Sequence, residues 1–61
     1  MKIIIADDHA LYRDGLRFNL GIMLPKAQIL DASSFAQALD LLKLNNDADL
    51  VLVNLDMSEA N

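Results

Sequence analysis

Two acidic clusters stand out in the sequence because each follows directly on a run of aliphatic residues. Asp7 and Asp8 follow the isoleucines at 3–5, and the segment Asn54-Leu55-Asp56 follows the leucine and valine run at 50–53. Continuous aliphatic runs of this kind are typical of strands buried on both faces, as in parallel sheets. In an open α/β sheet the ligand crevice lies at the carboxyl ends of the strands, so both clusters would face one crevice.

Three carboxylates that meet in one crevice, with no Lys or Arg adjacent in sequence, repel one another. A hard cation such as Mg²⁺ removes this repulsion because it shares the charge of the carboxylate oxygens. The sequence therefore predicts a divalent-metal site that uses Asp7 and Asp8.

The segment after the first acidic pair is expected to form a helix from about residue 10 to about residue 23. Asp8 is a candidate N-cap, and the helix must end before Pro25. A mid-helix glycine such as Gly15 usually allows close approach of the helix to a sheet. One stripe of the helix carries Leu11, Gly15, Phe18 and Ile22, with Leu16 and Leu20 beside it, whereas Tyr12, Arg13 and Arg17 are assigned to a solvated face.

A second helix is expected after a short strand at about 27–31. Ser34 and Gln37 have the spacing of a capping box, and the stripe with Phe35 and Leu39 is assigned to the core. A loop at 45–47 then leads to a third strand from about residue 49. The predicted order is β-α-β-α-β, and right-handed crossovers turn this order into an α/β fold with a parallel three-stranded sheet.

The composition limits the classes of function. The chain has 61 residues, of which 54% are hydrophobic, with no cysteine and a formal net charge of −4. A chain of this length forms one small domain at most and buries only about 60% of its unfolded surface, so the apolar excess indicates a partner or further chain. The charge gives no electrostatic footprint for nucleic acid or an anionic membrane. No segment has the length of a signal peptide or a membrane helix, so a cytoplasmic location is expected.

Two segments carry a resemblance to a known family. The string Ile-Ile-Ala-Asp-Asp-His-Ala-Leu-Tyr-Arg-Asp-Gly-Leu at 4–16 and the string Asp-Leu-Val-Leu-Val-Asn-Leu-Asp-Met-Ser at 49–58 resemble a CheY-like receiver domain. The branch concerned is that of bacterial response regulators with a C-terminal helix-turn-helix output domain of the LuxR type. The resemblance implies that residues 1–61 are a partial receiver domain, a truncated flavodoxin-like (βα)2β half with strand order 2-1-3.

The resemblance also implies a function in two-component phosphorelay signalling and transcription regulation. A sensor histidine kinase would be the partner of the full-length regulator, and DNA would be bound only through an output domain outside these residues. Asp7 and Asp8 match the acidic pair that binds Mg²⁺, and Asp56 matches a position whose backbone carbonyl is a metal ligand. The phospho-acceptor position falls on Asn54, and Ser58 replaces a proline common in the next loop.

The amide at the acceptor position predicts a loss of phosphorylation. An amide oxygen is a far poorer nucleophile than a carboxylate and cannot form an acyl phosphate, so the chain is expected to be a binding module and not an enzyme. A weak Mg²⁺ site is still expected. In the alternative view, Asp8 only caps the helix and Asn54 only bonds the turn. His9 is taken as a surface or loop-packing residue, and Asp56 as an improbable substitute acceptor.

Other functional classes stay open at this point. The chain could be a structural half-domain without signalling chemistry, which forms a homodimer through the edge of the third strand at 51–53. A small metal-dependent phosphatase or phosphotransferase is a weaker alternative, because the sequence offers no tuned general base and no cation to hold a phosphate.

Overall fold

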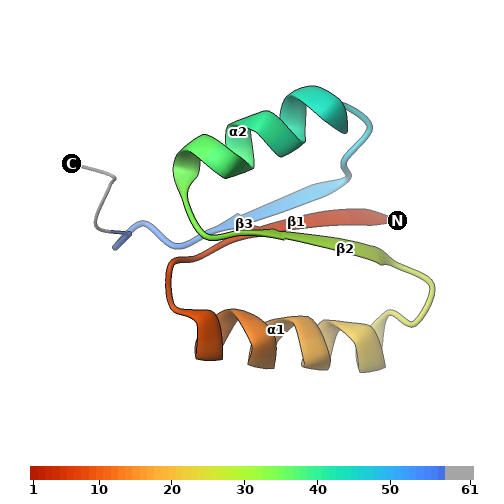
Figure 1. Ribbon diagram of the computed structural model, residues 1–61. Helices are drawn as coiled ribbons and strands as arrows, with labels where there is room; N and C mark the ends of the chain where they lie inside the picture. The colour runs from red at the N-terminus through yellow and green to blue at the C-terminus, as the bar shows by residue number, and fades with distance from the viewer. Residues whose placement is uncertain (58–61) are drawn as a thin grey trace.

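The computed structural model describes residues 1–57, which form a three-stranded parallel sheet with one helix on each face (Figure 1). The strand order is β2-β1-β3, which confirms the predicted α/β fold and its 2-1-3 topology. Ser58 lies outside the described residues. In chain order the elements are β1 (Lys2–Ala6), α1 (Ala10–Met23), β2 (Gln28–Ala32), α2 (Phe35–Leu44) and β3 (Leu50–Val53).

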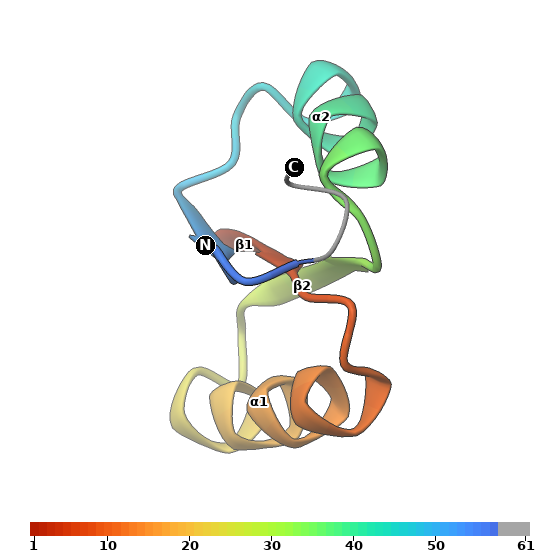
Figure 2. The same ribbon diagram turned by 90° about the vertical axis from the view of Figure 1, so that its left-hand side faces the viewer.

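The central position of β1 explains its unbroken run of isoleucines. Ile4 pairs with Leu30 on β2 and with Val51 on β3, so β1 has a hydrogen-bonded neighbour on both sides. Helices α1 and α2 cover the two faces of the sheet (Figure 2). The side chains of Ile3 and Ile4 point to opposite faces, yet both are 0% exposed. A strand in this position needs apolar residues on both faces.

Helix α2 begins at Ser34, the N-cap that the sequence predicts, but Gln37 bonds back to Ser33 and not to Ser34 as a capping box would. The hydroxyl of Ser34 accepts a hydrogen bond from the backbone N–H of Gln37 at 3.0 Å, and the Gln37 side chain accepts one from the backbone N–H of Ser33 at 2.8 Å. Ala38 packs in the cluster with Ala6, Ala32 and Met57, against which Phe35 and Leu41 also pack.

The assignment of Leu39 to the core is wrong, since Leu39 is 56% exposed. The residues of α2 that reach the sheet are spaced three apart, at 35, 38 and 41. A position one residue after Ala38 is rotated by about 100° around the helix, which takes Leu39 out of this face.

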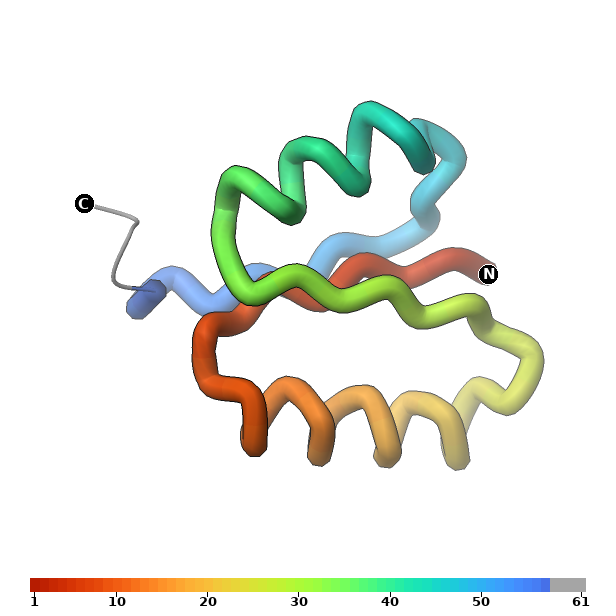
Figure 3. Tube along the Cα trace, in the orientation of Figure 1, coloured from red at the N-terminus to blue at the C-terminus, as the bar shows by residue number. Residues whose placement is uncertain are grey.

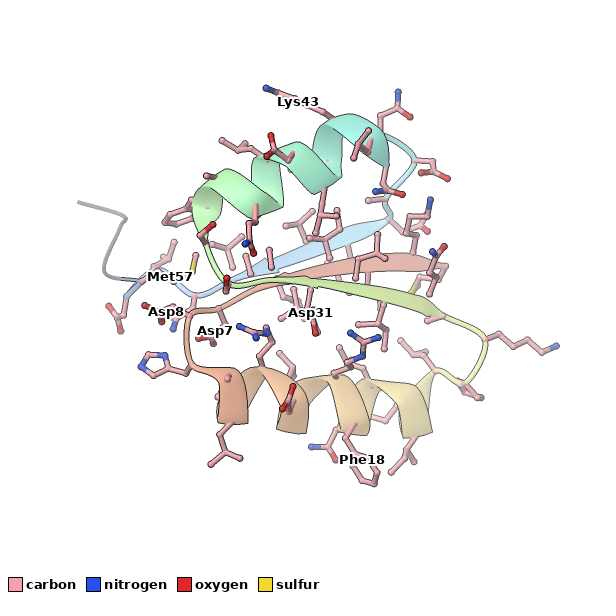
Figure 4. All side chains as sticks on the ribbon, in the orientation of Figure 1. Asp7, Asp8, Phe18, Asp31, Lys43 and Met57 are labelled. Carbon is pink, nitrogen blue, oxygen red and sulfur yellow. The ribbon has the colours of Figure 1, made fainter. Side chains whose placement is uncertain are left out.

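Helix α1 turns a different face toward the sheet from the one that the sequence predicts. Leu16 and Leu20 are half-buried, whereas Leu11, Phe18 and Ile22 are exposed, and Phe18 points away from the sheet (Figure 4). An ideal Cβ on Gly15 would meet nothing within 4 Å, so the expected close approach to the sheet is also wrong.

In this rotation two arginines of α1 face Asp31 on β2. Arg17 donates a hydrogen bond to the Asp31 carboxylate at 2.8 Å, and the Nε of Arg13 lies 3.9 Å from the same oxygen. The assignment of Arg13 to a solvated face is therefore wrong, as its side chain is only 18% exposed. With both arginines turned toward β2, the stripe of Phe18 must face away.

Candidate metal site at the carboxyl end of the sheet

The strand register brings the two predicted acidic segments together. Ala6 pairs with Val53, so Asp7 and Asn54 each follow the last paired residue of neighbouring strands. The trace in Figure 3 places the loop after β1 beside the end of β3. The side-chain amide of Asn54 donates a hydrogen bond to Oδ1 of Asp7 at 3.2 Å, which confirms that both segments face one site.

Asp7 is a buried carboxylate whose Oδ1 accepts several hydrogen bonds. It is 2% exposed, and its Oδ1 accepts the backbone N–H of His9 at 2.8 Å in addition to the Asn54 amide. The bond from the His9 N–H is the main cause that lowers the pKa of Asp7; burial raises it, and the Asn54 amide and the His9 ring lower it further. These donors keep Asp7 ionised although little of it reaches solvent.

His9 contacts both carboxylates, which the sequence analysis did not foresee. Its Nδ1 lies 3.0 Å from Oδ1 of Asp7 and 3.0 Å from Oδ1 of Asp8. The His9 ring is 65% exposed, so its assignment to the surface is confirmed, but its role in the site was missed. An aspartate often bonds the backbone N–H two residues ahead in a turn, and this spacing from Asp7 is the signal that could have found it.

The prediction that Asp8 caps α1 is wrong. The N-cap residue is His9, whose side chain makes no capping hydrogen bond. The aspartate that bonds at this turn is Asp7, through the N–H of His9. Because the turn is fixed by Asp7, the carboxylate of Asp8 is left to contact the His9 ring.

Asn54 holds the turn after β3 with its other side-chain atom. Its Oδ1 accepts a hydrogen bond from the backbone N–H of Asp56 at 3.0 Å, which confirms the expectation that this residue bonds the turn. Asp56 is exposed, and its carboxylate lies outside the group formed by Asp7, Asp8 and His9. The expectation that three carboxylates meet in one crevice is therefore wrong. That its backbone carbonyl is a metal ligand stays a prediction.

The donor set at this site fits a divalent cation. One ligand atom from each of Asp7, Asp8 and His9 lies within 4.8 Å of the others. Two carboxylate oxygens suit Mg²⁺, and an added imidazole nitrogen suits Mn²⁺ as well. Positive charge also reaches the site from the protein, because Nη1 of Arg13 donates to the backbone oxygen of Asp7 at 2.7 Å. No Lys or Arg is adjacent to the carboxylates in the sequence, but the folded chain brings Arg13 next to them.

A largely apolar groove begins at the acidic site and runs between α1 and β3. Asp7, His9 and Asn54 form part of its lining. The rest is contributed mainly by apolar side chains, among them Leu11, Leu16, Leu52, Val53 and Leu55.

Comparison with known proteins shows a similarity to part of a bacterial protein. The chain is 34% identical over 56 residues to a glycerol metabolism activator of Pseudomonas putida, and the match covers 92% of this chain and 25% of that protein. The chain therefore spans about a quarter of the length of this curated relative. No family model matches the chain, and no solved structure matches it. Within residues 1–57, neither helix has the length and apolar character that a membrane span requires.

Proposed function

We propose that this chain is a receiver-type signalling module of a two-component response regulator, which binds a divalent cation and does not accept a phosphoryl group. The observation that supports this proposal best is the buried, ionised Asp7, which lies beside Asp8 at the carboxyl end of β1 and is reached by Asn54 from β3. The motif at 4–16, which resembles the opening of a receiver, supports the same assignment.

In this proposal each residue of the site has a separate role. Asp7 and Asp8 hold the cation, while Asn54 occupies the position of the nucleophile and contributes only hydrogen bonds. An amide does not form an acyl phosphate, so the module acts by binding and has no turnover. The name of the Pseudomonas putida relative, an activator, is consistent with a regulatory role. A sensor kinase and a DNA-binding output domain belong to the proposal for a longer protein.

The test of the cation site is a calorimetric titration with Mg²⁺ and Mn²⁺ at low salt. We expect weak binding, with a Kd on the order of 1 mM because few carboxylates are available. The double variant Asp7→Asn, Asp8→Asn should lose this heat. The control is Asp14→Asn, Asp40→Asn, which removes the same charge from exposed positions on the two helices. Equal heats for the parent and the first double variant would contradict the proposal.

A structural role in self-association is the second candidate, and one observation favours it. Strand β3 pairs with β1 on one side and with no strand of residues 1–57 on the other. Apolar side chains lie along and after it, with Leu50 43% exposed and Leu55 80% exposed. An open apolar edge of this kind is a template for pairing with another chain.

A further inference from the structure

We infer that Arg13 is a positioning residue for the acidic pair: it fixes the backbone of Asp7 and thereby sets the affinity of the site for a divalent cation. The inference rests on the proposed cation site. Asp7 and Asp8 would touch the cation, whereas Arg13 acts through the peptide group that follows Asp7.

The contact of Arg13 with Asp7 is short and shielded from solvent. Nη1 of Arg13 donates to the backbone oxygen of Asp7 at 2.7 Å, and the Arg13 side chain is 18% exposed. A hydrogen bond from a charged donor is stronger than a neutral one, and a low local dielectric strengthens it further.

The backbone of Asp7 needs this donor because the ladder between β1 and β2 has ended. The last registered pair is Ala6 with Ala32, after which the N–H of Asp7 still bonds the Ala32 oxygen at 3.1 Å. The Asp7 oxygen bonds Arg13 instead. Both backbone groups of Asp7 are therefore held, and a fixed backbone restricts where its carboxylate can lie.

Arg13 makes the hydrogen bond to the Asp7 backbone although another of its N–H donors, Nε, has no hydrogen-bond partner. Its Nε is buried and has no hydrogen-bond partner among the described residues, since the nearest carboxylate oxygen, on Asp31, is 3.9 Å away. A buried donor without a partner is costly. An arginine that served only to pair with Asp31 would be expected to close this distance, so the geometry favours the contact with Asp7 as its main role.

Two possible influences of Arg13 on cation affinity predict opposite effects when Arg13 is removed: its positive charge, and its hold on the backbone of Asp7. The positive charge of Arg13 opposes a cation nearby, so its loss would tighten binding if charge were its only influence. If Arg13 holds Asp7 in place, its loss weakens binding despite the charge removed. Arg17 is the matched control, because it is on the same helix and binds the same Asp31, but lies about one turn further from Asp7.

The experiment compares Arg13→Met, Arg13→Lys and Arg17→Met with the parent. Loss of a group that orients a metal ligand commonly lowers metal affinity about 10-fold or more, and we expect this rise in the Mn²⁺ Kd for Arg13→Met. Arg13→Lys keeps the charge with a shorter, single-pronged donor and should fall between the parent and Arg13→Met. Arg17→Met should match the parent.

A second readout does not need a metal. The N–H of His9 bonds the Asp7 carboxylate, so its exchange with solvent, measured by NMR, reports on the position of Asp7. Arg13→Met should speed exchange at His9 relative to the mid-helix amide of Phe18, whereas general loosening of α1 would speed both. Unchanged or tighter Mn²⁺ binding, together with unchanged exchange at His9, would overturn the inference.

The two proposals can fail separately. If the parent binds no Mn²⁺, the proposed cation site is wrong, and exchange at His9 alone decides the role of Arg13. If Arg13→Met does not fold, Arg13→Lys decides by the same two readouts. Parent-like values for Arg13→Lys would then overturn the inference, and a raised Kd with faster His9 exchange would support it.

Discussion

The carboxylate of Asp7 is almost completely shielded from solvent, and it stays ionised because hydrogen-bond donors reach its Oδ1 and lower its pKa. Its pKa is lowered chiefly by the His9 N–H. The unfolded chain therefore takes up a proton at Asp7 before the folded chain does, and stability falls as the pH drops. The contribution of Asp7 is complete above roughly pH 4 and is lost as the pH falls through the lowered pKa.

We expect Asp7→Asn to flatten the acid side of the stability profile. Urea unfolding followed by circular dichroism between pH 7 and pH 2.5 measures this change. Asp47→Asn is the comparison, because a hydrogen bond from Lys2 lowers the pKa of Asp47, but this carboxylate is exposed and its ion pair is screened by solvent. If Asp47→Asn reduced the loss of stability at low pH more than Asp7→Asn did, Asp7 would not be the main source of that loss.

Under the proposed function, placing a carboxylate at position 54 should give the chain the capacity for acyl phosphate chemistry. In Asn54→Asp the amide that now bonds Asp7 becomes a third carboxylate beside those of Asp7 and Asp8, which both attracts Mg²⁺ and supplies a nucleophile. We expect intact-mass spectrometry after incubation with acetyl phosphate and Mg²⁺ to show a phosphoryl adduct on Asn54→Asp only. An adduct on the unaltered chain, at Asp56 for example, would show that the chemistry assigned to Asn54 is wrong.

At the scale of elements, the orientation of α1 predicts that substitutions at Leu16 and at Phe18 change the free energy of unfolding by different amounts. Leu16 is half-buried against the rest of the fold, whereas Phe18 is 68% exposed. Leu16→Ala should lower the free energy of unfolding by about 1–2 kcal/mol, less than for a fully buried leucine. Phe18→Ser should change it by about 0.5 kcal/mol or less, as for most surface substitutions. Urea denaturation of both variants gives the two values, and a larger loss for Phe18→Ser would place the Phe18 stripe in the core.

The order of the elements and the cap of α2 could be predicted from the sequence because their causes are local. The run at 3–5 indicates a buried strand by composition alone, and the Ser34 and Gln37 spacing marks a helix start whatever the helix packs against. The pairing of Asp7 with Asn54 also followed, since parallel strands bring their carboxyl ends to one edge.

The rotation of α1 and the surroundings of the acidic pair could not be predicted in this way. The stripe of Phe18 has helical spacing, but spacing does not show which face of a helix meets the sheet. Arg13 contacts a backbone oxygen next to β1 and approaches Asp31 on β2, and both partners are fixed only by the tertiary structure. His9 lies at the helix start because Asp7, and not Asp8, bonds the turn.

At the scale of the whole molecule, the fully buried core is small. The largest fully buried side chains within residues 1–57 are Ile3, Ile4, Ile5 and Met57. Many large apolar side chains are exposed at the same time, and a domain of about 60 residues is marginally stable by itself. Further burial of apolar surface would stabilise this fold by roughly 25 cal/mol per Å².

We therefore expect a homodimer in which β3 pairs with its counterpart along the open edge. Light scattering across a dilution series should show dissociation, and the melting temperature should rise with protein concentration. Leu50→Lys places a charge on this edge and should shift the equilibrium toward monomer. The control is Leu44→Lys, because Leu44 is 82% exposed and belongs to α2, outside the open edge of the sheet. A monomer that melts cooperatively at micromolar concentration would refute the dimer.

The central position of β1 has a consequence for the order of events during synthesis. The ribosome makes β1 before both of its neighbours, yet Ile3 is covered only when Ile29 and Leu50 have reached it. Pairings over such separations form slowly because a long loop must close first. Until β3 has left the ribosome, the isoleucines form an exposed apolar segment on the nascent chain, and a chaperone that binds short extended apolar segments would meet it there.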